Sequence, residues 1–220
     1  MDNLINRGET TFLRALDSSE QLDQWWAEHP NAIGVAFVGR SNVGKSSLIN
    51  ALFGNKVAKT SKTPGRTQKI NIFSFRLSEE SREHVFYLYD LPGYGHAQVN
   101  KAMSKNWREI MDAFFMTLNG RTLLFNLQDA RHPNQSTDKQ FYEYINPKLV
   151  DIFLVFNKID KLKKQKERAA LNKLKPAILD SYKHVKQIFY VSAEKKSGVD
   201  VLEQSLVSYI YRIFEADQLD

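Results

Sequence analysis

Short apolar runs separated by polar segments recur along the chain. Three of them are continuously apolar, which is typical of central parallel strands covered on both faces: residues 33–38, 122–127 and 152–156. Residues 69–77 alternate apolar and polar positions, and residues 83–89 form a further run after a polar turn, so this part predicts an antiparallel hairpin. A last run, residues 187–191, completes six predicted strands.

Apolar residues at helical spacing follow several of these runs. The first predicted helix carries Leu48, Ile49, Leu52 and Phe53, and Gly54 stands where it would end. A longer helix is predicted from Met103, Trp107, Ile110, Met111, Phe114, Phe115 and Leu118. Two more are predicted around residues 137–145 and over Leu202, Leu206, Ile210 and Ile213. The alternation predicts an α/β, doubly wound, three-layer domain with a mostly parallel six-stranded sheet and one antiparallel edge strand.

The pattern divides the chain into an extension, one domain and a tail. Residues 1–30 are predicted to be an N-terminal extension packed on the domain, in which residues 12–16 resemble a short strand outside the six. Ser18 and Gln21 form a capping box ahead of a short helix. Trp25 and Trp26 on that helix are predicted to pack on the core edge. Residues 31–216 are the domain and residues 217–220 the tail.

Composition narrows the class of protein. At 42% hydrophobic and 25% charged residues, the 220-residue chain has the material for a full core. It contains no cysteine, which excludes disulfides, thiolate metal sites and a cysteine nucleophile. The N-terminus lacks an apolar signal core and no run is long enough to span a bilayer, so we expect a cytoplasmic protein without a membrane partner. The net charge of +6 favours an anionic macromolecule as partner.

A glycine-rich loop lies between the strand at 33–38 and the first helix. Gly39-Arg40-Ser41-Asn42-Val43-Gly44-Lys45-Ser46, followed by Ser47, has the spacing of a phosphate-binding loop. Its backbone N–H groups can converge on phosphate oxygens at a helix N-terminus, where the helix dipole favours negative charge. Lys45 is predicted to reach the β- and γ-phosphates of a nucleotide, and the Ser46 hydroxyl to bind Mg²⁺.

Further motifs fall on loops that follow other strands. In Asp90-Leu91-Pro92-Gly93, the acidic group can hold Mg²⁺ and the Gly93 N–H can touch a γ-phosphate. In Asn157-Lys158-Ile159-Asp160, a carboxylate at Asp160 can accept both N–H groups of the guanine edge, a pattern that adenine does not offer. In Val191-Ser192-Ala193, a backbone N–H can reach the guanine O6.

One loop completes the predicted site. Thr63-Pro64-Gly65-Arg66-Thr67-Gln68 supplies hydroxyls between the first helix and the second strand, and Thr67 is the predicted ligand of Mg²⁺ and sensor of the γ-phosphate. The metal ligands are therefore Ser46, Thr67 and Asp90, and the catalytic groups Lys45, Thr67 and Gly93. The predicted cofactors are GTP or GDP with Mg²⁺.

These stretches in this order resemble the EngB (YihA/YsxC) family of bacterial GTP-binding proteins, over nearly the whole chain. The resemblance rests on the strings at residues 39–50, 63–68, 90–95 and 129–133, the last being Asp-Ala-Arg-His-Pro. It implies a P-loop GTPase domain and an essential assembly factor for the large (50S) ribosomal subunit, earlier linked to septum formation in cell division. One departure is Asn157, where many members have Thr; Asn is the commoner residue across GTPases, so the guanine assignment stands.

The resemblance also bears on hydrolysis. Tyr94 follows Gly93 where a Gln would orient the attacking water, which implies slow intrinsic turnover, on the order of 10⁻⁴–10⁻² s⁻¹. Asn42 resembles the K⁺-contacting residue of some related GTPases, so K⁺ is a candidate cofactor. His96 and His132 are candidates for positioning water, although solvated loop histidines are the more common case.

Positive side chains gather in two segments. Lys56, Lys59, Lys62, Arg66 and Lys69 surround the threonine loop, and Lys161, Lys163, Lys164, Lys166 and Arg168 follow the guanine motif. The first set is the better placed to sense both nucleotide and RNA phosphate, whereas the second is as readily a solvated face. The expected partner is a precursor of the large subunit, both rRNA and ribosomal proteins, bound by a monomer that does not bind DNA. Two alternatives stay open: a P-loop kinase or ATPase, and an interaction module that binds GTP without meaningful hydrolysis.

Overall fold

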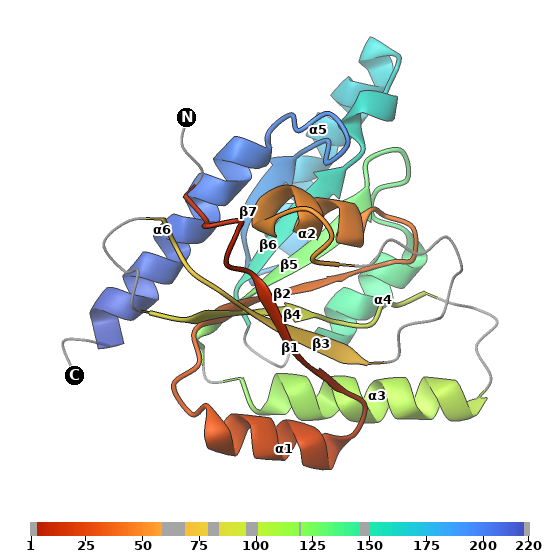
Figure 1. Ribbon diagram of the computed structural model, residues 1–220. Helices are drawn as coiled ribbons and strands as arrows, with labels where there is room; N and C mark the ends of the chain where they lie inside the picture. Colours follow the sequence, from red (N-terminus) through yellow and green to blue (C-terminus); the bar gives the residue numbers. More distant parts are fainter. Residues whose placement is uncertain are drawn as a thin grey trace.

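The computed structural model describes residues 4–58, 69–78, 84–95, 101–118, 120–145 and 150–217. In chain order the elements are β1 (Thr11–Leu16), α1 (Ser19–Glu28), β2 (Gly34–Gly39), α2 (Lys45–Phe53), β3 (Ile70–Phe75), β4 (Phe86–Asp90), α3 (Lys101–Met116), β5 (Thr122–Asp129), α4 (Ser136–Ile145), β6 (Ile152–Asn157), a single turn of 3₁₀ helix η2 (Ile159–Lys161), α5 (Gln165–Ser181), β7 (Val185–Tyr190) and α6 (Val199–Asp217). Figure 1 shows them around one central sheet.

The strands form one sheet in the order β1-β3-β4-β2-β5-β6-β7. β2 pairs in parallel with β4 and β5, and the parallel pairing continues through β6 to β7. β3 runs antiparallel to both of its neighbours, β4 and β1. The predicted fold class and the hairpin of β3 with β4 are thus confirmed.

The predicted strand count was wrong by one. Within the described residues the sheet has seven strands, not six. The short strand predicted at residues 12–16 outside the sheet is β1, which pairs with β3 and becomes the edge, so the antiparallel strand β3 is not at the edge. The reason is local: four of the six residues of β1 are exposed, so the strand buries too little of either face to leave an alternating apolar pattern.

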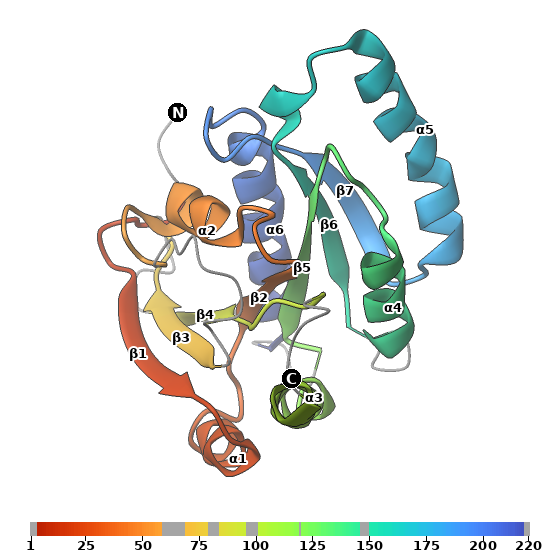
Figure 2. The same cartoon turned by 90° about the vertical axis from the view of Figure 1, so that its right-hand side faces the viewer.

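Helices cover both faces of the sheet, as Figure 2 shows, and an apolar layer lies on each face. On one face, β2, β5 and β6 pack against α2 and α6. On the other, they pack against α1, α3, α4 and α5. All residues of β2, β5 and β6 are buried, as their continuous apolar runs predicted. Among the described residues, no helix combines the length and the apolarity that crossing a bilayer requires.

The N-terminal residues are part of this packing. Ser18 caps α1, where its Oγ accepts a hydrogen bond from the Gln21 N–H at 3.4 Å, which is one half of the predicted capping box. The other half differs, because Gln21 Oε1 accepts from the Asp17 N–H at 2.9 Å rather than from Ser18. Trp25 is 1% exposed and stacks on His29, and Trp26 lies against Tyr89. Both tryptophans therefore pack onto the core, as predicted.

Candidate nucleotide site

The carboxyl ends of four parallel strands meet at one edge of the sheet, and most of the predicted site residues lie there. The register pairs Phe37 of β2 with Asp90 of β4, Gly39 of β2 with Leu127 of β5, and Asp129 of β5 with Asn157 of β6. Loops that leave a parallel sheet at this edge form the usual ligand site of doubly wound folds. The fold thus brings the glycine-rich loop, the Asp90 loop and the Asn157 loop side by side.

The glycine-rich loop is compressed between β2 and the neighbouring loops. A Cβ at Gly39 would lie 2.6 Å from the Leu127 carbonyl oxygen, and a Cβ at Gly44 would lie 2.4 Å from Asn157 Nδ2. Gly44 also has φ +93°, in the left-handed region. It is the N-cap of α2, yet no side chain caps that helix, so the first N–H groups of α2 are available to an anion.

Lys45 and Asp90 lie together at the mouth of this loop. Lys45 begins α2 and its Nζ contacts Asp90 Oδ1 at the end of β4, with the two side chains 15% and 9% exposed. Ser46 and Ser47 follow Lys45 in the first turn of α2. A lysine amine, a hydroxyl and a carboxylate at a helix N-terminus fit the phosphates of a nucleotide and the oxygen ligands of Mg²⁺.

The segment after Asp90 runs beside the end of β2. The Leu91 N–H donates to the Phe37 carbonyl at 3.0 Å, and the Tyr94 N–H donates to the Gly39 carbonyl at 3.2 Å. Gly93 therefore lies against the phosphate loop, where a Cβ would be 2.9 Å from the Gly39 carbonyl oxygen.

Asn157 joins three loops through one amide. Its Nδ2 donates to the Val43 carbonyl at 3.0 Å, and its Oδ1 accepts from the N–H groups of Lys158 at 2.8 Å and Ala193 at 3.0 Å. Asn157 is 2% exposed; its bond to Val43 is buried, and its bonds from Lys158 and Ala193 are partly buried. The glycine-rich loop, the Asn157 loop and the Ser192 loop are consequently held in one arrangement.

Asp160 lies in the loop after β6 and contacts Ser192 and Lys161. The Ser192 hydroxyl donates to its Oδ1 at 2.6 Å, and Lys161 Nζ lies 3.0 Å from its Oδ2. The hydrogen bond from Ser192 is the largest cause that lowers the pKa of Asp160 below its ordinary value, so this carboxyl is held ionised as an acceptor. Ser192 thereby has a side-chain role that was not predicted. A backbone N–H of the Val191–Ala193 stretch was predicted to reach the guanine O6, but all three N–H groups donate within the protein, to the carbonyls of Phe156 and Ser197 and to Asn157 Oδ1.

Lys158 links the base side of the site to the phosphate side. It has φ +67°, its Nζ contacts the Asn42 carbonyl oxygen, and the same Nζ lies 3.0 Å from Asp129 Oδ2. Arg131 also holds Asp129, through bonds of 2.9 and 2.6 Å. Burial alone would raise the pKa of Asp129, but the hydrogen bonds from Arg131 and Lys158 lower it well below the usual range. Sequence reasoning gave Asp129 no role in the site, although it belongs to the Asp-Ala-Arg-His-Pro string.

Some predicted residues cannot be placed. Thr63, Pro64, Gly65, Arg66 and Thr67, including the predicted magnesium ligand and γ-phosphate sensor, lie outside the described residues, as does His96. His132 is exposed on the loop before α4.

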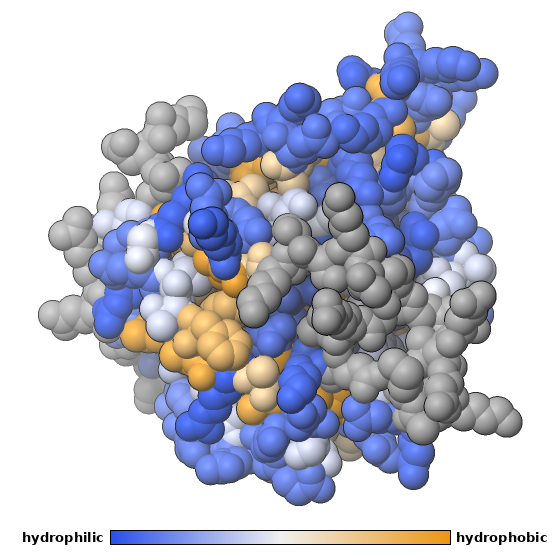
Figure 3. Space-filling model, turned by 45° about the vertical axis from the view of Figure 1, so that its right-hand side comes forward, coloured by the Kyte–Doolittle hydropathy of each residue, from blue (hydrophilic) through white to orange (hydrophobic). Residues whose placement is uncertain are grey.

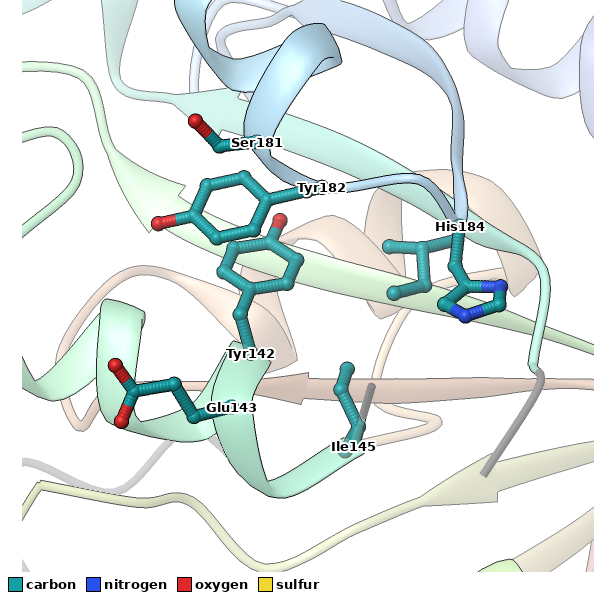
Figure 4. Close-up of a pocket in the computed structure, with 7 residues that line it drawn as sticks. Tyr142, Glu143, Ile145, Ser181, Tyr182 and His184 are labelled. Atoms are coloured by element: carbon teal, nitrogen blue, oxygen red, sulfur yellow. The ribbon is translucent and has the colours of Figure 1, made fainter. Parts of the chain in front are cut away.

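The described part of the chain also holds a small pocket of about 120 Å³, shown in Figure 4. Tyr142 and Tyr182, whose rings stack at 3.8 Å, line it together with Ile152 at the amino end of β6. Since Asn157 ends the same strand, this pocket lies at the opposite edge of the sheet and is separate from the candidate nucleotide site.

Three features together define a P-loop GTPase. They are a glycine-rich phosphate loop between β2 and α2, an acidic group at the end of the neighbouring strand β4, and an Asn-Lys-x-Asp loop beside them. Residues 34–158 match a family described as "50S ribosome-binding GTPase". The chain belongs to the EngB family of GTP-binding proteins. It is 39% identical to the "Probable GTP-binding protein EngB" of Photorhabdus laumondii over 175 residues, 79% of this chain and 80% of that protein.

Other comparisons agree with this assignment. The protein of the same description from Campylobacter lari is 38% identical over 201 residues, covering 87% of this chain and 92% of that protein. Among solved structures, a variant of Aquifex aeolicus Era bound to GDP.AlF4⁻ superposes with a TM-score of 0.65 at 26% identity, over 80% of this chain but only 56% of the Era chain. A probable GTP-binding protein engB superposes with a TM-score of 0.59 at 21% identity, over 81% and 99% of the two chains, and supports the fold.

Proposed function

We propose that this protein is a slowly hydrolysing GTP switch that assists assembly of the large (50S) ribosomal subunit in the cytoplasm, with a secondary link to septum formation. The observation that carries the nucleotide part is the Asn157 amide, which ties the glycine-rich loop to the two loops expected to read guanine. A site with that connection holds the phosphates and the base of one nucleotide at a fixed separation. An ATPase or kinase would leave the Asp160 carboxylate without a role.

Each residue has a proposed task. The loop from Gly39 to Ser47 surrounds the phosphates, and Lys45 neutralises charge on the β- and γ-phosphates. Asp160 accepts the guanine N–H groups. The Ala193 N–H donates to Asn157 Oδ1 at 3.0 Å, so it would have to exchange that bond to meet the guanine O6. Ser46, Thr67 and Asp90 would hold Mg²⁺, which supplies charge neutralisation on the phosphate oxygens when bound.

The protein changes between a GTP-bound and a GDP-bound state because some of its contacts can form only with the γ-phosphate. Thr67 and the Gly93 N–H both reach for it, so GTP orders the loops that carry them and hydrolysis releases those contacts. Tyr94 replaces the water-orienting Gln, so turnover is slow, on the order of 10⁻⁴–10⁻² s⁻¹, until a partner group or K⁺ near Asn42 assists.

The charge distribution supports an RNA partner. Residues 161–183 carry eight Lys and Arg side chains and two acidic ones, a net charge of +6 that equals the net charge of the whole chain. All eight basic residues are exposed. Only Lys161 of the eight forms an ion pair with another described residue, to Asp160 and Glu194. The end of α5 nearer Gln165 projects from the body of the protein (Figures 1 and 2), and the projection at the top of Figure 3 is mostly hydrophilic. Cations that form no ion pair with a described residue, on and beside a projecting helix, suit the phosphate backbone of RNA.

The family description "50S ribosome-binding GTPase" further supports this partner. The test is co-sedimentation of the monomeric protein with large-subunit particles at several salt concentrations, in GTP and in GDP. We expect nucleotide-dependent binding that weakens steeply with salt. Reversing two charges on α5, Lys173→Glu with Lys175→Glu, should weaken it further. The matched pair Arg108→Glu with Lys139→Glu, on α3 and α4, should not. Binding that ignores both nucleotide and the α5 charges would contradict the proposal.

Guanine selectivity needs its own measurement. GDP should displace a fluorescent guanine nucleotide at concentrations where ADP does not, and Asp160→Ala should abolish this preference. Glu194→Ala is the control, since Glu194 also pairs with Lys161, at 2.8 Å, but has no proposed contact with the base. Equal displacement by GDP and ADP in the unmodified protein would refute the guanine site.

A further inference from the structure

Tyr94 directly follows Gly93, yet its side chain is turned into the protein. The residue is 7% exposed, and its ring stacks on Phe141 at 4.4 Å with an interplanar angle of 7°. Its hydroxyl donates to Asp138 Oδ1 at 2.9 Å and accepts from Asn126 Nδ2 at 3.1 Å. Both hydrogen bonds are buried, so this side chain is committed to contacts with β5 and α4 and is not directed at a water beside the γ-phosphate.

Asp138 on α4 also holds the phosphate loop. Arg40 Nε donates to the same Oδ1 at 2.9 Å, and the Gln135 N–H donates to Oδ2 at 2.8 Å. Arg40 extends the connection through an Nη2 bond of 2.7 Å to the His132 carbonyl. Asp138 is 0% exposed, and burial raises its pKa while Arg40 and the Tyr94 hydroxyl act in the opposite direction. One buried carboxylate therefore joins the phosphate loop to the segment after Gly93.

Backbone hydrogen bonds also connect Tyr94 to the phosphate loop. The Tyr94 N–H bonds the Gly39 carbonyl, and Arg40 and Tyr94 form a parallel bridge. Gly93 lies between these anchors and Asp90. Two interactions of Tyr94 thus set the position of the Gly93 N–H relative to the phosphate loop. One is the hydrogen bond from the Tyr94 backbone to Gly39, and the other is the hydrogen bond from the Tyr94 hydroxyl to Asp138, which also binds Arg40.

We propose that Tyr94 and Asp138 are positioning residues of GTP hydrolysis, which hold the Gly93 N–H where it meets the γ-phosphate. The inference rests on the proposed guanine-nucleotide site and adds two residues to it. Because GDP lacks the γ-phosphate, loosening this anchor costs affinity for GTP and catalytic rate, and leaves affinity for GDP unchanged. A hydrogen bond that only stabilised the fold would not separate the two nucleotides.

The test is Tyr94→Phe, which keeps the ring on Phe141 and removes only the hydroxyl. We expect kcat to fall about tenfold and affinity for a non-hydrolysable GTP analogue to fall about three- to tenfold, with GDP affinity within about twofold of the unmodified protein. Asp138→Asn should also lower kcat and affinity for the GTP analogue, but the comparison with GDP is made on Tyr94→Phe, because Asp138 also holds Arg40 of the phosphate loop. Tyr209→Phe is the matched control, because Tyr209 lies on α6, away from the phosphate loop, and its hydroxyl donates to Asp151 at 3.2 Å.

Three results decide the matter. A GTP-selective loss in Tyr94→Phe, absent from Tyr209→Phe, supports the proposal. Equal loss of GTP and GDP affinity, or unchanged kcat with only a lowered melting temperature, overturns it and leaves a structural role. If the unmodified protein binds no guanine nucleotide, the proposed function itself fails, and that outcome is distinguishable because it precedes any variant.

Discussion

Replacing Asn157 by alanine removes the amide that connects three loops of the candidate site. The substitution breaks the bond to the Val43 carbonyl at 3.0 Å and the bonds from the N–H groups of Lys158 and Ala193, at 2.8 and 3.0 Å. Asn157 is 2% exposed, so one buried acceptor and two partly buried donors lose their partners. Each such buried group costs about 1–3 kcal/mol.

Water that enters the space left by the side chain will satisfy part of this loss. We therefore expect the free energy of unfolding without nucleotide to fall by about 2–4 kcal/mol, near the lower end of the sum. For a chain of this size that lowers the melting temperature by roughly 5–15 °C. Without these hydrogen bonds the loops proposed to bind the base are no longer held to the phosphate loop. We therefore expect the folded variant to bind GDP about 10- to 100-fold more weakly than the unmodified protein.

The assay combines urea unfolding with GDP titration at a temperature where the variant is folded. Asn50→Ala is the matched control, since the Asn50 amide makes two hydrogen bonds to the backbone of Ala58, at 3.0 and 2.8 Å, without joining the three loops. It should lower stability while keeping GDP affinity within about threefold. If Asn157→Ala were destabilised as expected but bound GDP as tightly as Asn50→Ala does, the loops would not need this amide to form the site.

Three further outcomes are expected. Gly44→Ala, whose Cβ would meet Asn157 Nδ2 at 2.4 Å, should reduce GDP affinity more than a Ser47→Ala control in the same titration. Asp129→Asn should lower the free energy of unfolding by about 2 kcal/mol at neutral pH. Because the folded state depresses the pKa of Asp129, this difference should persist down to about pH 5 and shrink as the pH falls below about 4, and urea titrations across that range measure it. Trp25→Ala, at a residue 1% exposed, should cost about 3–5 kcal/mol by urea unfolding with GDP affinity retained in the folded protein.

The layers and the loops of the candidate site were predictable because each has a local signature. β5 and β6 are buried along their whole length, and a continuous apolar run is the direct consequence of that burial. Gly44 must be glycine because of its own φ and of the side chain pressed against it, so the loop is visible in the spacing of a few residues. β1 has no such signature, since most of its residues are exposed at the sheet edge, and its place in the sheet depends on pairing with β3.

The helix α5 is also hard to predict from its sequence, because few of its residues are buried. Only Leu171 and Ile178 of its 17 residues are buried, and Pro176 lies inside it. Its sequence therefore indicates a basic segment more strongly than an amphipathic helix, although Leu171 and Ile178, at a helical spacing of seven, do mark one face. What places the helix is the contact of those two residues with the layer that also contains α4.

The connection from Arg40 to Asp138 could not be predicted, for a reason that applies to the site as a whole. The two residues are 98 positions apart, and each is unremarkable in its own segment: an arginine in a polar loop and an acid in the first turn of a helix, where acids are common anyway. Only the packing of α4 beneath the phosphate loop turns Asp138 into a buried acceptor shared by Arg40 and Tyr94. Motifs that bind a ligand through backbone geometry are readable from spacing, whereas side chains that hold those motifs in place become visible only when the sheet has brought distant segments together.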